Sequence, residues 1–120
     1  MSYDIRFGVK AEGVDEIVVI GQPENDSPTY NLREMFVACM DWDYKQGEWY
    51  RVSEVLPKFE RGLHELRFNS KAYKKYEPDN GWGSIYSAVE CLQSVIEKTQ
   101  FYVEGHGWNQ IPLEALWIAW

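Results

Sequence analysis

The chain has 120 residues, of which 45% are hydrophobic and 26% charged, and its net charge at pH 7 is −7. This length corresponds to a single domain, residues 1–120, whose core forms without disulfides or metals. An acidic chain is poorly suited to nucleic-acid phosphates or to an anionic membrane surface, so neither is an expected partner. No apolar run approaches the ~20 residues of a membrane span, and the N-terminal sequence lacks the apolar region of a signal peptide, which predicts a cytoplasmic protein.

Two strands are predicted near the N-terminus. Apolar and polar residues alternate over residues 3–10, which is the pattern of a half-buried strand. A short turn at residues 12–15 leads into residues 16–21, so the two strands are expected to form an antiparallel hairpin. The second strand is almost uniformly apolar, which favours a central position with both faces covered.

The first helix is predicted over residues 32–40, where apolar residues recur at helical spacing. Asn31 is the expected N-cap, with Glu34 as its capping-box partner. The aromatic and acidic residues 41–50 are expected to form a loop. This loop lacks the ligand spacing of a calcium site, so no metal is predicted there.

Ser53 is the expected cap of the second helix, which should begin near Ser53 or slightly later because Pro57 is tolerated only near the first turn. Gly62 lies inside this helix, and an interior glycine predicts close packing against a neighbouring element. A short basic segment, residues 71–76, should form one or two helical turns and stop before the Glu77-Pro78 pair. The apolar stripe of the second helix comprises Leu56, Phe59, Leu63 and Leu66.

The most regular helix is predicted over residues 84–99, and residues 101–103 either extend it or begin a short strand. Leu116, Ile118 and Trp120 alternate with their neighbours, which favours a C-terminal strand over a helical turn. The resulting order, β-β-α-α-α-β, predicts an α+β two-layer fold. A small antiparallel sheet, made of the N-terminal hairpin and the C-terminal strand, would pack on about three helices.

The residues that usually carry chemistry do not form a recognisable catalytic motif. Cys39 and Cys91 lie on predicted helices among apolar residues, where buried free thiols are expected. His64 and His106 have no ligand at metal-like spacing, so no metal site is predicted. Ser84 lies outside any Gly-x-Ser-x-Gly elbow, and the sequence has no phosphate-loop or dinucleotide fingerprint. Neither enzymatic activity nor a cofactor is expected, and a hydrolase built on Ser84, His64 and His106 is kept as a third hypothesis.

One local motif, residues 79–86, permits a structural and a functional interpretation. As a structural element it begins the third helix, with Gly81 at positive φ, Trp82 plugging the core and Gly83 or Ser84 as the cap. As a binding element it would present free N–H groups to an anion. If this helix start lay beside that of the first helix, the two would form a pocket for an anion or a nucleotide. The candidate ligand-binding residues are Tyr30, Asn31, Asn80, Gly81, Trp82, Gly83 and Ser84.

Several short motifs resemble a group of small proteins found in phage and prophage genomes. They are Thr29-Tyr30-Asn31 followed by Met35-Phe36, then residues 73–78, then Asn80-Gly81-Trp82-Gly83 before the helix from Ser84. The resemblance covers about residues 29–99. It implies an accessory protein of a mobile element, assigns no activity and carries over no functional residue.

The sequence therefore favours a small acidic, non-enzymatic accessory or interaction protein that binds a partner protein. The hypothesis rests on the acidity, on the lack of a catalytic motif and on aromatic residues in predicted loops, namely Trp42, Trp49, Tyr50 and Trp108. The alternative is a small-ligand module that binds an anion or a nucleotide at its helix N-termini. The chain is expected to be a monomer or a homodimer, and a strand ending at Trp120 would leave an edge that can pair.

Overall fold

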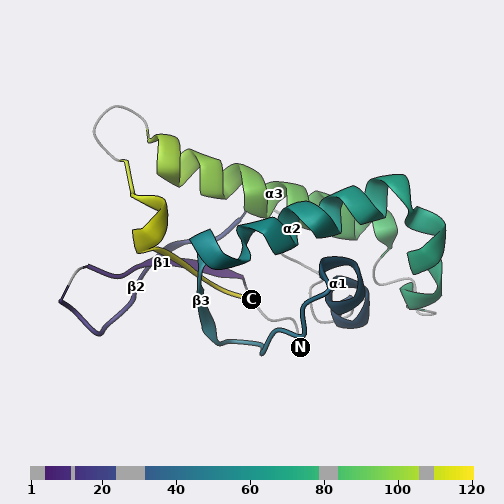
Figure 1. The fold of residues 1–120 in the computed structure, drawn as a ribbon, viewed down its shortest axis with the longest axis horizontal. Helices are drawn as coiled ribbons and strands as arrows, with labels where there is room; N and C mark the ends of the chain where they lie inside the picture. Colours follow the sequence, from purple (N-terminus) through teal and green to yellow (C-terminus); the bar gives the residue numbers. More distant parts are fainter. Residues whose placement is uncertain (1–4, 12, 24–31, 79–83, 106–109) are drawn as a thin grey trace.

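The computed structural model describes residues 5–11, 13–23, 32–78, 84–105 and 110–120. Its antiparallel sheet and its helices confirm the predicted α+β class (Figure 1). In chain order the elements are β1 (Arg6–Val9), β2 (Val18–Gly21), α1 (Arg33–Met40), β3 (Trp49–Arg51), α2 (Val52–Phe68), the 3₁₀ helix η1 (Ser70–Tyr76), α3 (Ile85–Glu104), the 3₁₀ helix η2 (Leu113–Ala115) and β4 (Leu116–Ala119).

The sheet has four strands in the order β2-β1-β4-β3, and every neighbouring pair is antiparallel. The C-terminal strand β4 is internal, because Ile118 pairs with Phe7 on one side and with Tyr50 on the other. The prediction that the strand ending at Trp120 leaves a free edge is therefore wrong, since β2 and β3 form the edges. The three-stranded sheet predicted from the sequence lacked β3, which lies in the segment predicted to be a loop.

The hairpin of β1 and β2 is confirmed, with Val9 opposite Val18 and a bulge between Phe7 and Gly8. The predicted central position of β2 is wrong, because β2 is an edge strand. Its Val18, Val19 and Ile20 are 62%, 49% and 37% exposed. An apolar run signals a preference for burial, but the sheet order places β2 at an edge, where the described residues cover it on one side only.

Helices α2 and α3 lie side by side over one face of the sheet and extend beyond it towards α1 and η1 (Figure 1). The two long helices run antiparallel, and the molecule measures 45 × 27 × 22 Å. Helix α2 contacts β3 and β4, whereas α3 reaches β1, where the ring centroids of Tyr102 and Phe7 are 5.4 Å apart. The helical layer is thus ordered across the sheet, with α3 on the side of β2.

The core on the inner, helix-covered face of the sheet is dominated by aromatic rings. Trp120 is 1% exposed and lies at its centre. Its ring centroid is 5.2 Å from those of Phe36 and Phe59 and 5.8 Å from that of Tyr44. Rings at these separations pack favourably beyond the area they bury. One side chain from α1, one from α2 and one from the loop after α1 therefore pack against Trp120, the residue that follows β4.

Helix α1 begins one residue later than predicted, because Leu32 occupies the N-cap position and makes no side-chain cap. Asn31, the predicted cap, lies outside the described residues. Leu32 is fully buried instead, so core packing fixes the start of this helix. At the other end Asp41 adopts a left-handed conformation, with φ of 51°, and its N–H bonds the carbonyl of Ala38.

Helix α2 begins at Val52, directly after β3, and the predicted Ser53 cap is wrong. Pro57 falls in the second turn rather than the first, so the carbonyl of Ser53 loses its usual i+4 donor. Pairing of β3 with β4 fixes the backbone just before the helix and so moves its start forward. The predicted close approach at Gly62 is confirmed: a Cβ there would lie 2.7 Å from Cγ of Met40 and 3.2 Å from Cδ1 of Leu92.

Helix α3 is longer than predicted, since residues 101–103 extend it to Glu104. Ser84 is its N-cap, as the helix-start interpretation predicts, and its Oγ accepts from the N–H of Ser87 at 3.1 Å. The basic segment before it is the 3₁₀ helix η1, and Glu77 is extended before Pro78, as predicted. Residues 79–83, including the predicted plug Trp82, lie outside the described residues.

Candidate functional site

The outer face of the sheet, which no described helix covers, combines indoles with cationic side chains. Antiparallel pairing and strand alternation place one set of residues there, opposite the buried Phe7 and Ile118. We define the outer-face cluster as Arg6, Lys10, Trp49, Arg51 and Trp117. The cluster draws on β1, β3 and β4 and on the residue that follows β1.

Small residues form the floor of the outer-face cluster. Gly8 of β1 has no side chain, and a Cβ at this position would lie 3.0 Å from the Trp49 ring and would also meet Ile17. β4 lies between β1 and β3, and its residue opposite Trp49 is the small Ala119. The indole of Trp49 therefore reaches across β4 to β1, and glycine at position 8 leaves the room it needs.

Each cation in the outer-face cluster lies against an indole. The guanidinium carbon of Arg6 is 5.5 Å from the Trp49 ring centroid. Lys10 Nζ and the guanidinium carbon of Arg51 are 5.4 and 5.1 Å from that of Trp117. Such contacts contribute about 0.5–1 kcal/mol each at exposed sites and hold the cations in place. None of the three forms an ion pair within the described residues, so their charge is available to a carboxylate or another anion.

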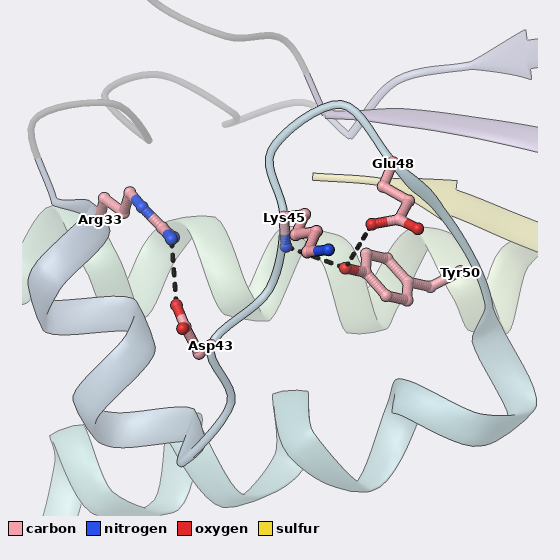
Figure 2. A network of polar contacts seen from close by, with 5 residues as sticks. All are labelled: Arg33, Asp43, Lys45, Glu48 and Tyr50. Atoms are coloured by element: carbon pink, nitrogen blue, oxygen red, sulfur yellow. Dashed lines mark hydrogen bonds and ion pairs between the residues drawn. The ribbon is translucent and has the colours of Figure 1, made fainter.

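The loop between α1 and β3 leads into the strand that carries Trp49 and Arg51, and polar contacts hold this loop in place (Figure 2). The Tyr50 hydroxyl accepts from the backbone N–H of Lys45 at 2.8 Å and donates to Glu48 at 3.3 Å. The N–H of Gly47, which has φ of +82°, donates to the carbonyl of Trp120 at 2.8 Å. These contacts tie the turn to the end of β4, and so fix where Trp49 and Arg51 emerge.

A second polar group, at the start of α1, joins an exposed ion pair to a buried tyrosine. The guanidinium of Arg33 donates to the carboxylate of Asp43 at 3.1 Å (Figure 2). The guanidinium carbon of Arg33 is also 4.7 Å from the Tyr44 ring centroid. The Tyr44 hydroxyl lies beside Arg33 and the indole N–H of Trp120 without meeting hydrogen-bond geometry. Burial raises the pKa of Tyr44 to about 12, although the nearby Arg33 opposes the rise. The phenol therefore stays protonated and does not act as a base near neutral pH.

The thiols and histidine add no reactive centre in the described residues. Burial raises the pKa of Cys39 to about 12, which makes its thiol a poor nucleophile, and Cys91 is likewise buried and free of disulfide. His64 is exposed on α2 and stacks on Phe68 at 4.8 Å. Together with Ile96 of α3 it lines a groove, whereas Ser84 lies twelve residues earlier on that helix, a rise of about 18 Å. Ser84 and His64 are thus not brought together.

Of the predicted ligand-binding residues, Ser84 lies within the described part of the chain. Tyr30, Asn31 and residues 80–83 lie outside the described residues, as does His106, so the convergence of the two helix starts is not observed. At the start of α3 two amides already have acceptors: Ile85 N–H donates to the Glu77 carboxylate at 3.1 Å, and Ser87 N–H donates to Ser84. The described part of the chain holds no group of three metal-ligating side chains, and none of its helices is long and apolar enough to cross a bilayer.

Sequence reasoning missed the outer-face cluster, although the signal was present. Alternation over residues 3–10 places Arg6 and Lys10 on the face opposite the buried one, and alternation near the C-terminus does the same for Trp117. Trp49 and Arg51 were hidden because β3 has only three residues, too few for a period to be recognised. The side-by-side arrangement of these strands comes from the sheet order alone.

The fold and this cluster define a small α+β protein with one helix-covered and one open sheet face. Comparison with protein-family models, characterised proteins and solved structures found no match to this chain.

Proposed function

We propose that this chain is a non-enzymatic binding protein, whose outer sheet face recognises an acidic segment of a partner protein. The single observation that carries the proposal is the outer-face cluster: three cations lie against two indoles on an open sheet face and have no ion-pair partner within the described residues. On the sequence resemblance alone, we further propose that it is an accessory protein of phage or prophage origin.

The chemistry of the cluster suits a protein partner that carries carboxylates. Tryptophan and arginine are enriched where binding energy concentrates in protein interfaces, because they combine a large contact area with directed hydrogen bonds. The indoles would contact apolar parts of the partner, while Arg6, Lys10 and Arg51 would pair with its acids. The indole rings already hold these three cations in place, so their side chains would lose little rotamer entropy on binding.

The charge of the whole chain would direct an acidic partner towards the outer face of the sheet. With a net charge of −7 the chain as a whole repels an acidic segment, whereas the outer-face cluster would attract it through three cations. The same net charge disfavours a nucleic acid, whose phosphates would meet that repulsion along their length. The alternative, an anion bound at helix N-termini, has less support, because Glu77 already places a carboxylate on the first amide of α3.

The proposal is tested by titrating the ¹⁵N-labelled chain with a Glu-rich peptide and, separately, with an oligothymidylate of similar length. We expect the peptide to shift the indole N–H resonances of Trp49 and Trp117 more than those of the buried Trp120. Lys10→Gln and Arg51→Gln should each weaken peptide binding several-fold. Lys71→Gln, which removes the same charge from exposed η1, should change it less than about twofold, as exposed charges far from a site do.

Two results would overturn the proposal. One is a peptide-induced shift that centres outside the outer-face cluster or responds equally to Lys71→Gln and Arg51→Gln. The other is tighter binding of the oligothymidylate than of the peptide, which would identify the face as a stacking surface for single-stranded nucleic acid instead.

A further inference from the structure

The β2 edge of the sheet exposes more apolar surface than an isolated edge strand normally does. Within the described structure β2 pairs only with β1, and Val18, Val19 and Ile20 are 62%, 49% and 37% exposed. Edge strands are usually protected from pairing by charged side chains, proline or a covering element. β2 contains no charge and no proline within Val18–Gly21. Among the described residues nothing pairs with the N–H and C=O groups of its other edge, which is therefore a template for another strand.

Helix α3 continues this surface on the inner side of the sheet. Lys98 and Tyr102 both lie over Gly21 of β2, where an added Cβ would meet the Tyr102 hydroxyl and lie 4.0 Å from Cε of Lys98. Lys98 Nζ is 5.0 Å from the ring centroid of Phe101, which is 46% exposed. The same part of α3 lines a shallow pocket that also includes Glu97. Strand edge and helix face therefore form one surface with apolar residues and both signs of charge.

We propose that this surface binds a second copy of the chain, by antiparallel pairing of β2 with β2 about a twofold axis near Val19. The sheet would then continue across both protomers, and the two α3 helices would face each other on the same side of it. Such an interface is isologous, so every contact occurs twice. The proposal does not depend on the outer-face cluster and can fail or succeed independently of it.

The distribution of charge around β2 favours a second copy in this orientation. Residues 15 and 16 before the strand are acidic, whereas Gln22 and Pro23 after it are uncharged. Antiparallel pairing about Val19 therefore sets Glu16 opposite Gln22 of the second copy. A parallel arrangement would set Glu16 opposite itself, and like charges directly opposite are destabilising.

The helical contact has the same self-complementarity. Because α3 lies on the β2 side of the helical layer, extension of the sheet brings α3 of the second copy next to it. Lys98 of each protomer would then approach Glu97 of the other, and Phe101 would lose its exposure to water. A strand from an unrelated protein would satisfy the β2 edge but would leave this helical surface uncovered.

The test measures the mass of the full chain by sedimentation velocity from low to several hundred micromolar concentration. We expect the wild-type mass to rise from 14.1 kDa towards twice that value. Val19→Lys should raise the dissociation constant about tenfold or more, because lysine on an edge strand opposes its own copy across the axis. Val14→Lys is the matched control: Val14 is 47% exposed against 49% for Val19 and lies outside the strand, so its mass profile should follow the wild type.

Cysteine substitution gives a second measurement that does not depend on the lysine variant folding. Opposite Cα atoms in antiparallel strands are about 4.5–5.5 Å apart, within the range of a disulfide. Val19→Cys should therefore form a disulfide-linked dimer on mild oxidation, whereas Val14→Cys should not. The native Cys39 and Cys91 are buried and should not contribute. A wild-type chain that stays at 14.1 kDa throughout, or equal cross-linking of the two cysteine variants, would overturn the proposal.

Discussion

The two faces of the sheet use tryptophan for different purposes. On the inner face Trp120 is 1% exposed and is surrounded by Phe36, Phe59 and Tyr44, so its value is in packing. On the outer face Trp117 is half-buried and carries Lys10 and Arg51 against its ring. A high aromatic content therefore marks both a buried core and a partly exposed surface of paired indoles and cations, and the position of a tryptophan within its strand decides which of the two it joins.

The largest expected difference between the faces is in stability. Trp120→Ala should lower the free energy of unfolding by about 3–5 kcal/mol, because a fully buried ring is lost and a cavity remains. Trp117→Ala should lower it by about 1–2 kcal/mol, since the ring is only half-buried and its cation contacts are weak. Urea titrations followed by circular dichroism measure both. Equal losses would mean that the outer face is packed as a second core.

The loss of stability at alkaline pH tests whether water is excluded from the buried Tyr44 and Cys39 side chains. Burial raises the pKa of Tyr44 from 10.0 to about 12 and that of Cys39 from 9.0 to about 12. The folded chain thus keeps protons that the unfolded chain releases, so this stability is fully present below pH 9 and is lost as pH rises from 9 towards 12. Two pKa units at Tyr44 correspond to about 3 kcal/mol by pH 12.

Tyr44→Phe isolates this contribution. The variant should lose less stability than the wild type between pH 10 and pH 11, a difference of about 1 kcal/mol in urea titrations. At pH 7 its stability should stay within about 1 kcal/mol of the wild type, because the hydroxyl makes no hydrogen bond within the described residues. An unchanged alkaline slope would show that water reaches the phenol.

The last comparison adds one methyl group to a glycine on each side of the sheet. Gly62→Ala should cost about 1–3 kcal/mol, because the new Cβ would press on Met40, Cys39 and Leu92 in the core. This cost outweighs the ~1 kcal/mol gained in helix propensity. The size of the loss is read from the shift in the urea midpoint.

Gly8→Ala is the outer-face counterpart. Its Cβ would meet Cγ2 of Ile17 and lie 3.0 Å from the Trp49 ring. Both side chains are partly exposed and can shift towards water, so the loss should be about 1–2 kcal/mol and no larger than that of Gly62→Ala. The Trp49 indole resonance should nevertheless shift, because its ring loses its place over β1. A loss larger than that of Gly62→Ala would contradict the distinction between a packed and an adaptable face.

Much of the fold could be read from local patterns. Helical periodicity located α1, α2 and α3, because each buries one stripe against the others. Strand alternation gave β1 and β4 and, for β1, the correct buried face. Ser84 and Gly62 were predicted in their correct roles, since capping and close approach depend on residues within a turn or on the absence of a side chain.

What failed depended on partners distant in sequence. β3 is a strand because β4 lies beside it, and three residues carry no period that could have announced this. β2 is apolar yet exposed, because the sheet order puts it at an edge. The predicted binding residues were chosen for local turn chemistry, whereas the outer-face cluster joins residues from opposite ends of the chain.

The sequence by itself determined the helical stripes, the hairpin, the Ser84 cap and the alternation that assigns a side chain to one face of a strand. These depend on the fixed periods of helix and strand and on residues a few positions apart. Tertiary structure alone decided the order β2-β1-β4-β3, and with it the assembly of Arg6, Lys10, Trp49, Arg51 and Trp117. The physical reason is that burial of the inner face around Trp120 selects which strands become neighbours. The same strand order then decides which side chains lie next to one another on the outer face.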